Sequence, residues 1–263
     1  MPALETNATV VRHEELPGCL FRLWVKPDWD ASATDWHPGQ FLRFGVPAGE
    51  DTDKKLLRAL SMVSIDQGVI ELYAVKVEGG AVSPKLASLR EGDRCYAEEK
   101  ITGHFTASQL PEEIGKELWL MGTGAGIAPF VCMLRHDTDH LSRFERIVVV
   151  HTVRESDFLS FGSELVRRAG TDPRIHYIPV VTRSEQRLEI RDGHCALRER
   201  LPRLLENGQL ERASGTHLSA EDSVVMLCGN PDMIKEMTAA LEARSLTRHK
   251  KRVPGNIVSE RYW

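Results

Sequence analysis

The chain has 263 residues, and 34 Lys and Arg against 38 Asp and Glu give a formal net charge of −4 at pH 7. Its 41% hydrophobic and 27% charged residues are typical of a soluble globular protein and exclude disordered and fibrous classes, and the length favours two domains. The near-neutral charge argues against a dedicated nucleic-acid binder, and no apolar stretch approaches the roughly 20 residues that span a bilayer.

Cysteine usage and the N-terminal residues indicate a cellular compartment. The first 18 residues lack the basic and apolar regions of a secretory signal peptide. The five cysteines are Cys19, Cys95, Cys132, Cys195 and Cys228. Their odd number and wide spacing fit free thiols and exclude a disulfide framework, a structural zinc site and an iron–sulfur site. We therefore expect a cytoplasmic protein without a metal site, and any redox carrier must be an organic cofactor.

Short extended runs dominate the first part of the chain. They are residues 9–16, 20–27, 40–47, 60–65, 69–77 and 94–99. Because Gly, Pro and Asp separate these regularly spaced runs, they predict an antiparallel β-barrel. One short helix is predicted over Ser83–Leu89, with Ser83 as its N-cap and Pro84 as its first residue.

After Pro111 the pattern changes to apolar strands that alternate with amphipathic helices. The predicted strands are Glu117–Met121, Ile147–Val153, Ile175–Val181 and Val224–Cys228. The predicted helices are Ala128–Arg135, Phe161–Ala169, Ala196–Glu206 and Asp232–Arg244. This alternation predicts a parallel sheet covered by helices on both faces. We expect a barrel domain over residues 1–110 and an α/β domain over residues 111–263, with the boundary in the loop 108–115.

Three loops follow predicted strands, where parallel sheets bind their ligands. The first, GTGAGIAP at 122–129, opens a helix, so its glycines permit close backbone approach to a diphosphate at the helix N-terminus. The alternative is a plain tight turn. The second, VVTR at 180–183, offers Thr182 and Arg183, and Arg154 and Arg200 lie on neighbouring elements. Arginines there favour a ribose 2′-phosphate, hence NADP(H) over NAD(H), although each alone could be a solvated surface residue.

The third loop is CGNP at 228–231, where a thiol beside glycine leaves room for a planar ring. An isolated buried cysteine is otherwise a small core residue. The barrel half contains RALS at 58–61, an arginine and a hydroxyl that flank a strand start and suit a pyrophosphate and a ring atom. Tyr73 would add an aromatic face, and Ser83 a helix N-terminus.

Together these motifs resemble the bacterial ferredoxin–NADP(+) reductases over nearly the whole chain. RALS is similar to the family's flavin motif, GTGAGIAP to its NADP pyrophosphate loop, VVTR to its 2′-phosphate site and CGNP to its nicotinamide-side motif. The ending SERYW resembles the members whose C-terminal aromatic residue packs on FAD. The resemblance implies an FAD-binding antiparallel barrel, an NADP-binding α/β domain, and hydride transfer between NADPH and flavin N5, followed by single-electron exchange with ferredoxin or flavodoxin.

The resemblance also implies a role for individual residues. The implied FAD contacts are Arg58, Ala59, Leu60, Ser61, Tyr73, Ala81, Val82, Ser83, Ala125, Tyr262 and Trp263. The implied NADP contacts are Gly122, Thr123, Gly124, Arg154, Thr182, Arg183, Arg200, Gly229, Asn230 and Pro231. Ser61 near flavin N5, Cys228 beside the nicotinamide and Glu260 as a proton-delivering carboxylate are the implied catalytic residues.

Two positions depart from the family's pattern. Leu60 replaces the tyrosine that stacks on the flavin, which removes aromatic stacking of roughly 0.5–1.5 kcal/mol. Ala125 stands where a relative carries threonine, so a hydrogen bond to FAD is lost. Other functions that fit the motifs are an NAD(P)H-dependent reductase of free flavin or of an oxygenase, and a slow-turnover flavoprotein redox sensor.

The strongest basic cluster is the run RSLTRHKKR at 244–252. Its cationic residues are Arg244, Arg248, Lys250, Lys251 and Arg252. The run suits the docking of an acidic electron carrier, ferredoxin or flavodoxin, or is simply a solvated helix end. Nucleic acid is the least favoured partner because no aromatic element accompanies the run. We expect a monomer.

Overall fold

A computed structural model describes residues 6–48, 54–183, 189–191, 194–250 and 252–262. Contacts divide the chain into two compact units, Met1–Ala107 with Val131–Asp137 and Ser108–Phe130 with Thr138–Trp263. We call the first the barrel unit and the second the α/β unit. Among the helices of the described residues, none is long and apolar enough to cross a membrane.

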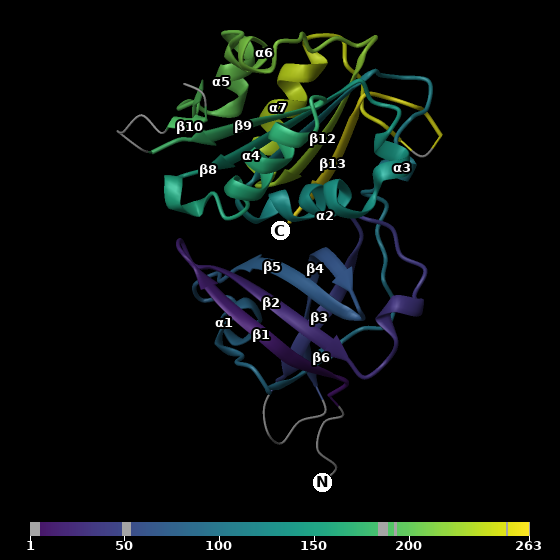
Figure 1. The fold of residues 1–263 in the computed structure, drawn as a ribbon, viewed down its shortest axis with the longest axis vertical. Coiled ribbons are helices and arrows are strands. Elements are labelled where there is room, and N and C mark those ends of the chain that lie inside the picture. The colour runs from purple at the N-terminus through teal and green to yellow at the C-terminus, as the bar shows by residue number, and fades with distance from the viewer. Residues whose placement is uncertain (1–5, 49–53, 184–188, 192–193, 251, 263) are drawn as a thin grey trace. The chain divides into compact units, whose positions relative to one another are not determined.

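Six antiparallel strands close the barrel unit in the order β1-β2-β5-β4-β3-β6 (Figure 1). They are β1 Ala8–Leu16, β2 Leu20–Pro27, β3 Phe41–Pro47, β4 Lys55–Asp66, β5 Val69–Val75 and β6 Arg94–Ala97. Alternate residues of these strands point inward and form a continuous apolar core that includes Phe21, Leu42, Phe44 and Leu72. The predicted antiparallel barrel is confirmed.

Two local predictions in the barrel unit are wrong. Strand β4 begins at Lys55, five residues before the predicted run, so RALS lies inside the strand rather than at its start. Helix α1 spans Ser83–Ser88 and its N-cap is Val82. The Ser83 hydroxyl does not cap the helix because it accepts a hydrogen bond from the Val77 N–H (2.9 Å).

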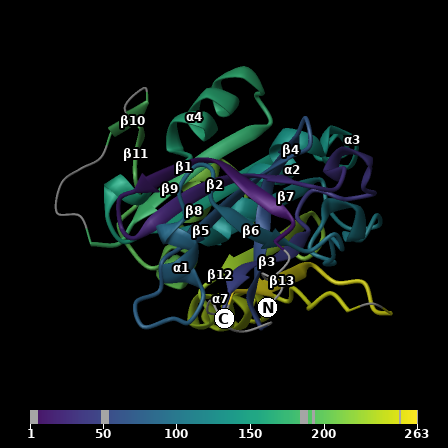
Figure 2. The ribbon, with the colours of Figure 1, turned by 90° about the horizontal axis from the view of Figure 1, so that it is seen from below.

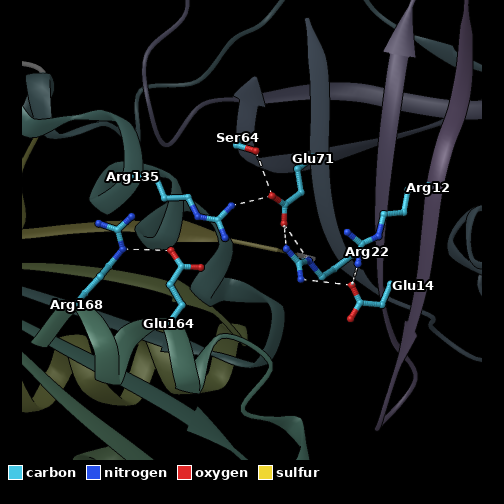
Figure 3. A network of polar contacts seen from close by, with 8 residues as sticks. All are labelled: Arg12, Glu14, Arg22, Ser64, Glu71, Arg135, Glu164 and Arg168. Carbon is cyan, nitrogen blue, oxygen red and sulfur yellow. Dashed lines mark hydrogen bonds and ion pairs between the residues drawn. The ribbon is translucent and has the colours of Figure 1, made fainter. Parts of the chain in front are cut away.

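Within the barrel unit, a buried carboxylate on β5 binds the second half of helix α2 (Ala128–His136) (Figure 3). Glu71 on β5 accepts from the Arg22 Nε (2.9 Å), from the Ser64 hydroxyl (3.1 Å) and from the Arg135 Nη1 (2.7 Å). Its side chain is only 5% exposed, so removal of the carboxylate would break the ion pairs of the half-buried Arg135 and Arg22, and would leave Arg22 its longer contact with Glu14 (3.4 Å).

The α/β unit is built on a five-stranded parallel sheet in the order β13-β12-β7-β8-β9 (Figure 1). The strands are β7 Glu117–Thr123, β8 Arg146–Val153, β9 Ile175–Val181, β12 Ser223–Gly229 and β13 Ile257–Arg261. Helix α2 begins in this unit, and the helices that lie wholly within it are α3 Thr138–Leu141, α4 Gly162–Thr171, α5 Leu201–Glu206, α6 Gln209–Ser214 and α7 Pro231–Glu242. This sheet confirms the predicted fold class.

Helices cover both faces of the sheet. Leucines and methionines of α5, α6 and α7 pack on Trp119, Met121, Val148 and Val150. Helix α4 lies on the opposite face, where Gly162 is close to the Tyr177 hydroxyl. A short hairpin, β10 Glu189–Arg191 with β11 His194–Cys195, lies beyond the β9 edge (Figure 2).

The predicted helix over Ala196–Glu206 starts late. Leu197 is extended and lies beside β9, where its N–H donates to the Pro179 carbonyl (3.0 Å) and its carbonyl accepts from Val181 (2.8 Å). The helix α5 can begin only at Leu201, with Pro202 in its first turn and Arg200 as its N-cap. Strand β13 and the hairpin β10–β11 were not predicted.

Candidate functional site

The glycine-rich turn joins β7 to α2. The strand continues to Thr123, a 3₁₀ turn spans Gly124–Ile127, and α2 begins at Ala128. Gly124 has φ +52°, and a Cβ added there would meet no atom within 4 Å. The outer side of the turn is therefore open, and its backbone N–H groups lie at the start of a helix, which suits an anionic group.

The glycine turn packs tightly against the CGNP loop. A Cβ on Gly126 would lie 2.5 Å from the Cys228 carbonyl oxygen, and one on Gly229, at φ +120°, would lie 2.3 Å from the Thr123 Oγ1. The Asn230 N–H donates to that same Thr123 hydroxyl (2.8 Å). Two motifs that lie over a hundred residues apart thus form one surface, and only glycine permits this approach.

Asn230 also begins helix α7. Its side-chain oxygen accepts from the N–H groups of Asp232 (2.8 Å) and Met233 (3.3 Å), and Pro231 occupies the first turn. The CGNP loop therefore presents a rigid helix start beside the glycine turn.

The C-terminal strand lies along this loop. Glu260 is the register partner of Cys228 on the parallel strands β13 and β12, and the Tyr262 N–H donates to the Gly229 carbonyl (3.3 Å). Burial, followed by the charge of Glu260, raises the pKa of the Cys228 thiol well above its ordinary value. Cys228 is therefore a neutral thiol and not a nucleophile. Trp263 lies outside the described residues.

Two of the predicted arginines lie side by side. The Arg183 N–H donates to the Arg154 carbonyl (2.9 Å), and the Thr182 N–H donates to the Val153 carbonyl (3.0 Å), which aligns the ends of β8 and β9. Arg154 and Arg183 are both exposed. Arg200 is the N-cap of α5 rather than a helical residue, and its exposed guanidinium is 3.5 Å from Glu236 on α7.

The predicted flavin residues of the barrel unit differ in exposure. On β4, Arg58 and Ala59 are exposed, Leu60 is half-buried against the apolar core, and Ser61 is buried. Tyr73 is only 1% exposed, so a contact between its ring and a flavin stays a prediction.

The remaining predicted flavin residues lie near helix α1 and in the glycine turn. Ala81 is exposed, while Val82 and Ser83 are half-buried at the start of α1. Ala125, in the glycine turn of the α/β unit, is buried.

Comparison with known proteins identifies the family. Residues 120–239 match the oxidoreductase NAD-binding domain. The chain is 36% identical over 259 residues to the flavodoxin/ferredoxin–NADP reductase of Escherichia coli (strain K12), with 97% of each chain covered. It is 31% identical over 268 residues to that of Buchnera aphidicola subsp. Schizaphis graminum, with 98% of each covered.

The chain belongs to the flavodoxin/ferredoxin–NADP reductase family of oxidoreductases. Its fold is also similar to the crystal structure of a ferredoxin NADP+ reductase from Neisseria gonorrhoeae with bound FAD and NADP. The TM-score is 0.86 at 27% identity, and 98% of each chain is covered.

Two cationic side chains of the basic run of this reductase are already paired with acidic side chains. Arg244 donates to Glu211 (3.0 Å) and to the Leu205 carbonyl (2.7 Å), and Arg248 donates to Glu242 (2.7 Å). Lys250 and Arg252 are exposed, and Lys251 lies outside the described residues. Helix α7 ends at Glu242, so the run is a turn and not a helix end.

The turn borders an open depression of about 510 Å³. It is lined by Glu242, Ser245, Leu246, Thr247, Arg248, Lys250 and Val253. Apolar and cationic groups share this surface with the carboxylate of Glu242, which is paired with Arg248.

Sequence reasoning missed two buried polar residues at the end of β8. His151 is fully buried and Thr152 is 8% exposed. The Thr152 hydroxyl has no hydrogen-bond partner among the described residues. Their signal in the sequence was the polar pair inside the otherwise apolar strand RIVVVHTV. Both lie where the strands end beside the glycine turn and Arg154.

Proposed function

We propose that this reductase binds FAD and NADP(H) and passes electrons between NADPH and ferredoxin or flavodoxin in the cytoplasm. The observation that carries the proposal is the single surface formed by the glycine turn, the CGNP loop and the end of β13, in a chain related to named reductases over 97% of its length. Bound FAD would supply the chemistry that connects a two-electron donor to a one-electron acceptor.

The α/β unit would bind NADP(H). The open N–H groups around Gly124 fit a diphosphate, because no atom lies within 4 Å of the position of its missing Cβ. The bond between Asn230 and Thr123 would fix the CGNP loop beside it. Arg154 and Arg183 would bind the 2′-phosphate with Thr182, and Arg200 would join them from the start of α5.

The end of the chain would border the nicotinamide. Cys228, held neutral by burial, offers a small apolar surface rather than a charged thiolate. Glu260 lies at the same level of the sheet and would hold a proton there. Tyr262, fixed by its N–H bond to Gly229, would lead the chain toward the flavin, and Trp263 completes the proposed contact.

The barrel unit would bind FAD through Arg58 on β4, whose exposed guanidinium suits a pyrophosphate. Ser61 would approach flavin N5. Leu60 contacts the core of the barrel, so its aliphatic side chain would offer the ring packing without aromatic stacking. Tyr73, Ala59, Ala81, Val82, Ser83 and Ala125 complete the proposed set.

The electron carrier would dock at the turn 250–253. Since Arg244 and Arg248 already pair with Glu211 and Glu242, we assign the steering charge to Lys250, Lys251 and Arg252. An acidic partner would also cover Val253, which is 59% exposed.

Stopped-flow kinetics of the NADPH-reduced enzyme test the acceptor. Ferredoxin and flavodoxin should reoxidise it rapidly, with a rate that falls as salt rises. Free flavin serves as the comparison. Faster reoxidation by free flavin than by either carrier protein would instead indicate that the protein is a flavin reductase.

A further inference from the structure

His151 lies at the carboxyl end of the central strand β8, fully buried. Its register partners are Gly122 on β7 and Pro179 on β9. Neither neighbour offers a side-chain donor or acceptor to the imidazole. A histidine in this position is unexplained by packing alone, since apolar residues occupy most of the strand.

The glycine turn sits on the same face of the sheet as His151. A Cβ on Gly122 would point at the turn, 3.0 Å from the Gly126 carbonyl oxygen and 3.1 Å from the Ile127 nitrogen. Because side chains of register partners on adjacent strands share a face, the imidazole of His151 lies next to the turn. The imidazole lies close enough to the Gly124 backbone for a weak hydrogen-bonding interaction between them to raise the pKa of His151.

The imidazole is neutral at physiological pH. Burial lowers the pKa of His151 to about 4, and the Gly124 backbone opposes this shift more weakly. A neutral imidazole carries one N–H donor. Neither ring nitrogen makes a hydrogen bond of normal distance and angle with a described residue. A buried N–H donor therefore lies beside the turn without a well-formed hydrogen bond. Such a donor is costly unless a partner completes it.

We propose that His151 is a positioning residue for the glycine turn. Its N–H holds the Gly124 carbonyl toward the sheet, so that the N–H groups of the turn face the diphosphate of the pyridine nucleotide. The bond tightens when the nucleotide binds, as loose bonds of ligand-free sites commonly do. The proposal rests on the proposed function, because it assumes that the turn binds NADP(H).

Three variants and one control test the proposal. His151→Leu removes the donor, while His151→Asn and His151→Gln keep an amide donor at one of the two ring-nitrogen positions. Tyr177→Phe is the matched control, since it removes a different buried polar atom, the Tyr177 hydroxyl oxygen, which also has no partner among the described residues. The affinity for NADP+ is measured by calorimetry, and amide exchange across residues 122–127 by mass spectrometry without nucleotide.

We expect His151→Leu to weaken NADP+ binding roughly two- to tenfold, the loss typical of one neutral hydrogen bond. Exchange across the turn should accelerate, and FAD content should stay unchanged. One amide variant should recover most of the affinity, and Tyr177→Phe should match the wild type. Equal affinity and equal exchange in His151→Leu and wild type would overturn the proposal.

A measurement on the unmodified protein covers the case in which His151→Leu does not fold. The ring nitrogen signals of His151 should report a single neutral tautomer and shift when NADP+ is added. Nitrogen signals that ignore saturating NADP+ would overturn the inference. Absence of NADP+ binding to the wild type would instead contradict the proposed function itself.

Discussion

The buried imidazole of His151 makes the stability of the protein depend on pH in a predictable way. An unfolded histidine has a pKa of 6.5, and burial lowers that of His151 to about 4. Between these values the unfolded chain binds a proton that the folded chain does not, so the free energy of unfolding falls as pH drops from 6.5 to 4. At about 1.4 kcal/mol per pKa unit, the full loss is about 3 kcal/mol.

Urea unfolding of wild type and His151→Leu at pH values from 7.5 to 4.5 measures this contribution. The difference between the two free energies isolates His151, because other titrating groups contribute equally to both proteins. We expect the wild type to lose about 2.5 kcal/mol more than the variant by pH 4.5. Tyr177→Phe should parallel the wild type, since tyrosine does not titrate in this range. Parallel profiles for wild type and His151→Leu would refute the assignment of a buried neutral imidazole.

Three further outcomes follow from the described contacts. Arg183→Ala should raise the Michaelis constant for NADPH roughly ten- to hundredfold, which corresponds to a loss of about 1.5–3 kcal/mol in binding, and should leave NADH kinetics unchanged. Equal effects on both nucleotides would contradict its 2′-phosphate role. Glu71→Ala should lower the unfolding free energy by about 3 kcal/mol, measured by urea unfolding, because Arg135 and Arg22 lose their ion pairs with a buried carboxylate. Charge reversal at Lys250 and Arg252 should slow ferredoxin or flavodoxin reduction at low salt but leave a small neutral acceptor unaffected, and a uniform loss would point to a damaged fold.

The fold was predictable where burial is complete. The run Val224–Cys228 is buried throughout the parallel sheet, and because both of its faces must be apolar, the whole run is apolar and indicates a strand. The partly exposed edge strand β13 carries Ser259, Glu260 and Arg261, and so lacks that signal. The extended path of Leu197 depends on its pairing with β9, which local preference does not encode.

The candidate site was predictable as a set of motifs and not as a geometry. Glycines in a turn after a strand indicate close approach, but the sequence does not say that Gly126 approaches Cys228 or that Asn230 bonds to Thr123. The role of a polar residue such as His151 depends on which face of the sheet the turn covers. These relations arise from tertiary packing, so they required the structure.

The proposed function requires that NADPH delivers electrons to FAD bound by this chain. An anaerobic titration of the purified protein with NADPH, followed by the flavin absorbance, tests it most directly, with NADH as the comparison. We expect a yellow protein whose flavin absorbance is bleached by one equivalent of NADPH and far more slowly by NADH. A protein that holds no flavin, or a bound flavin that NADPH does not bleach, would contradict it.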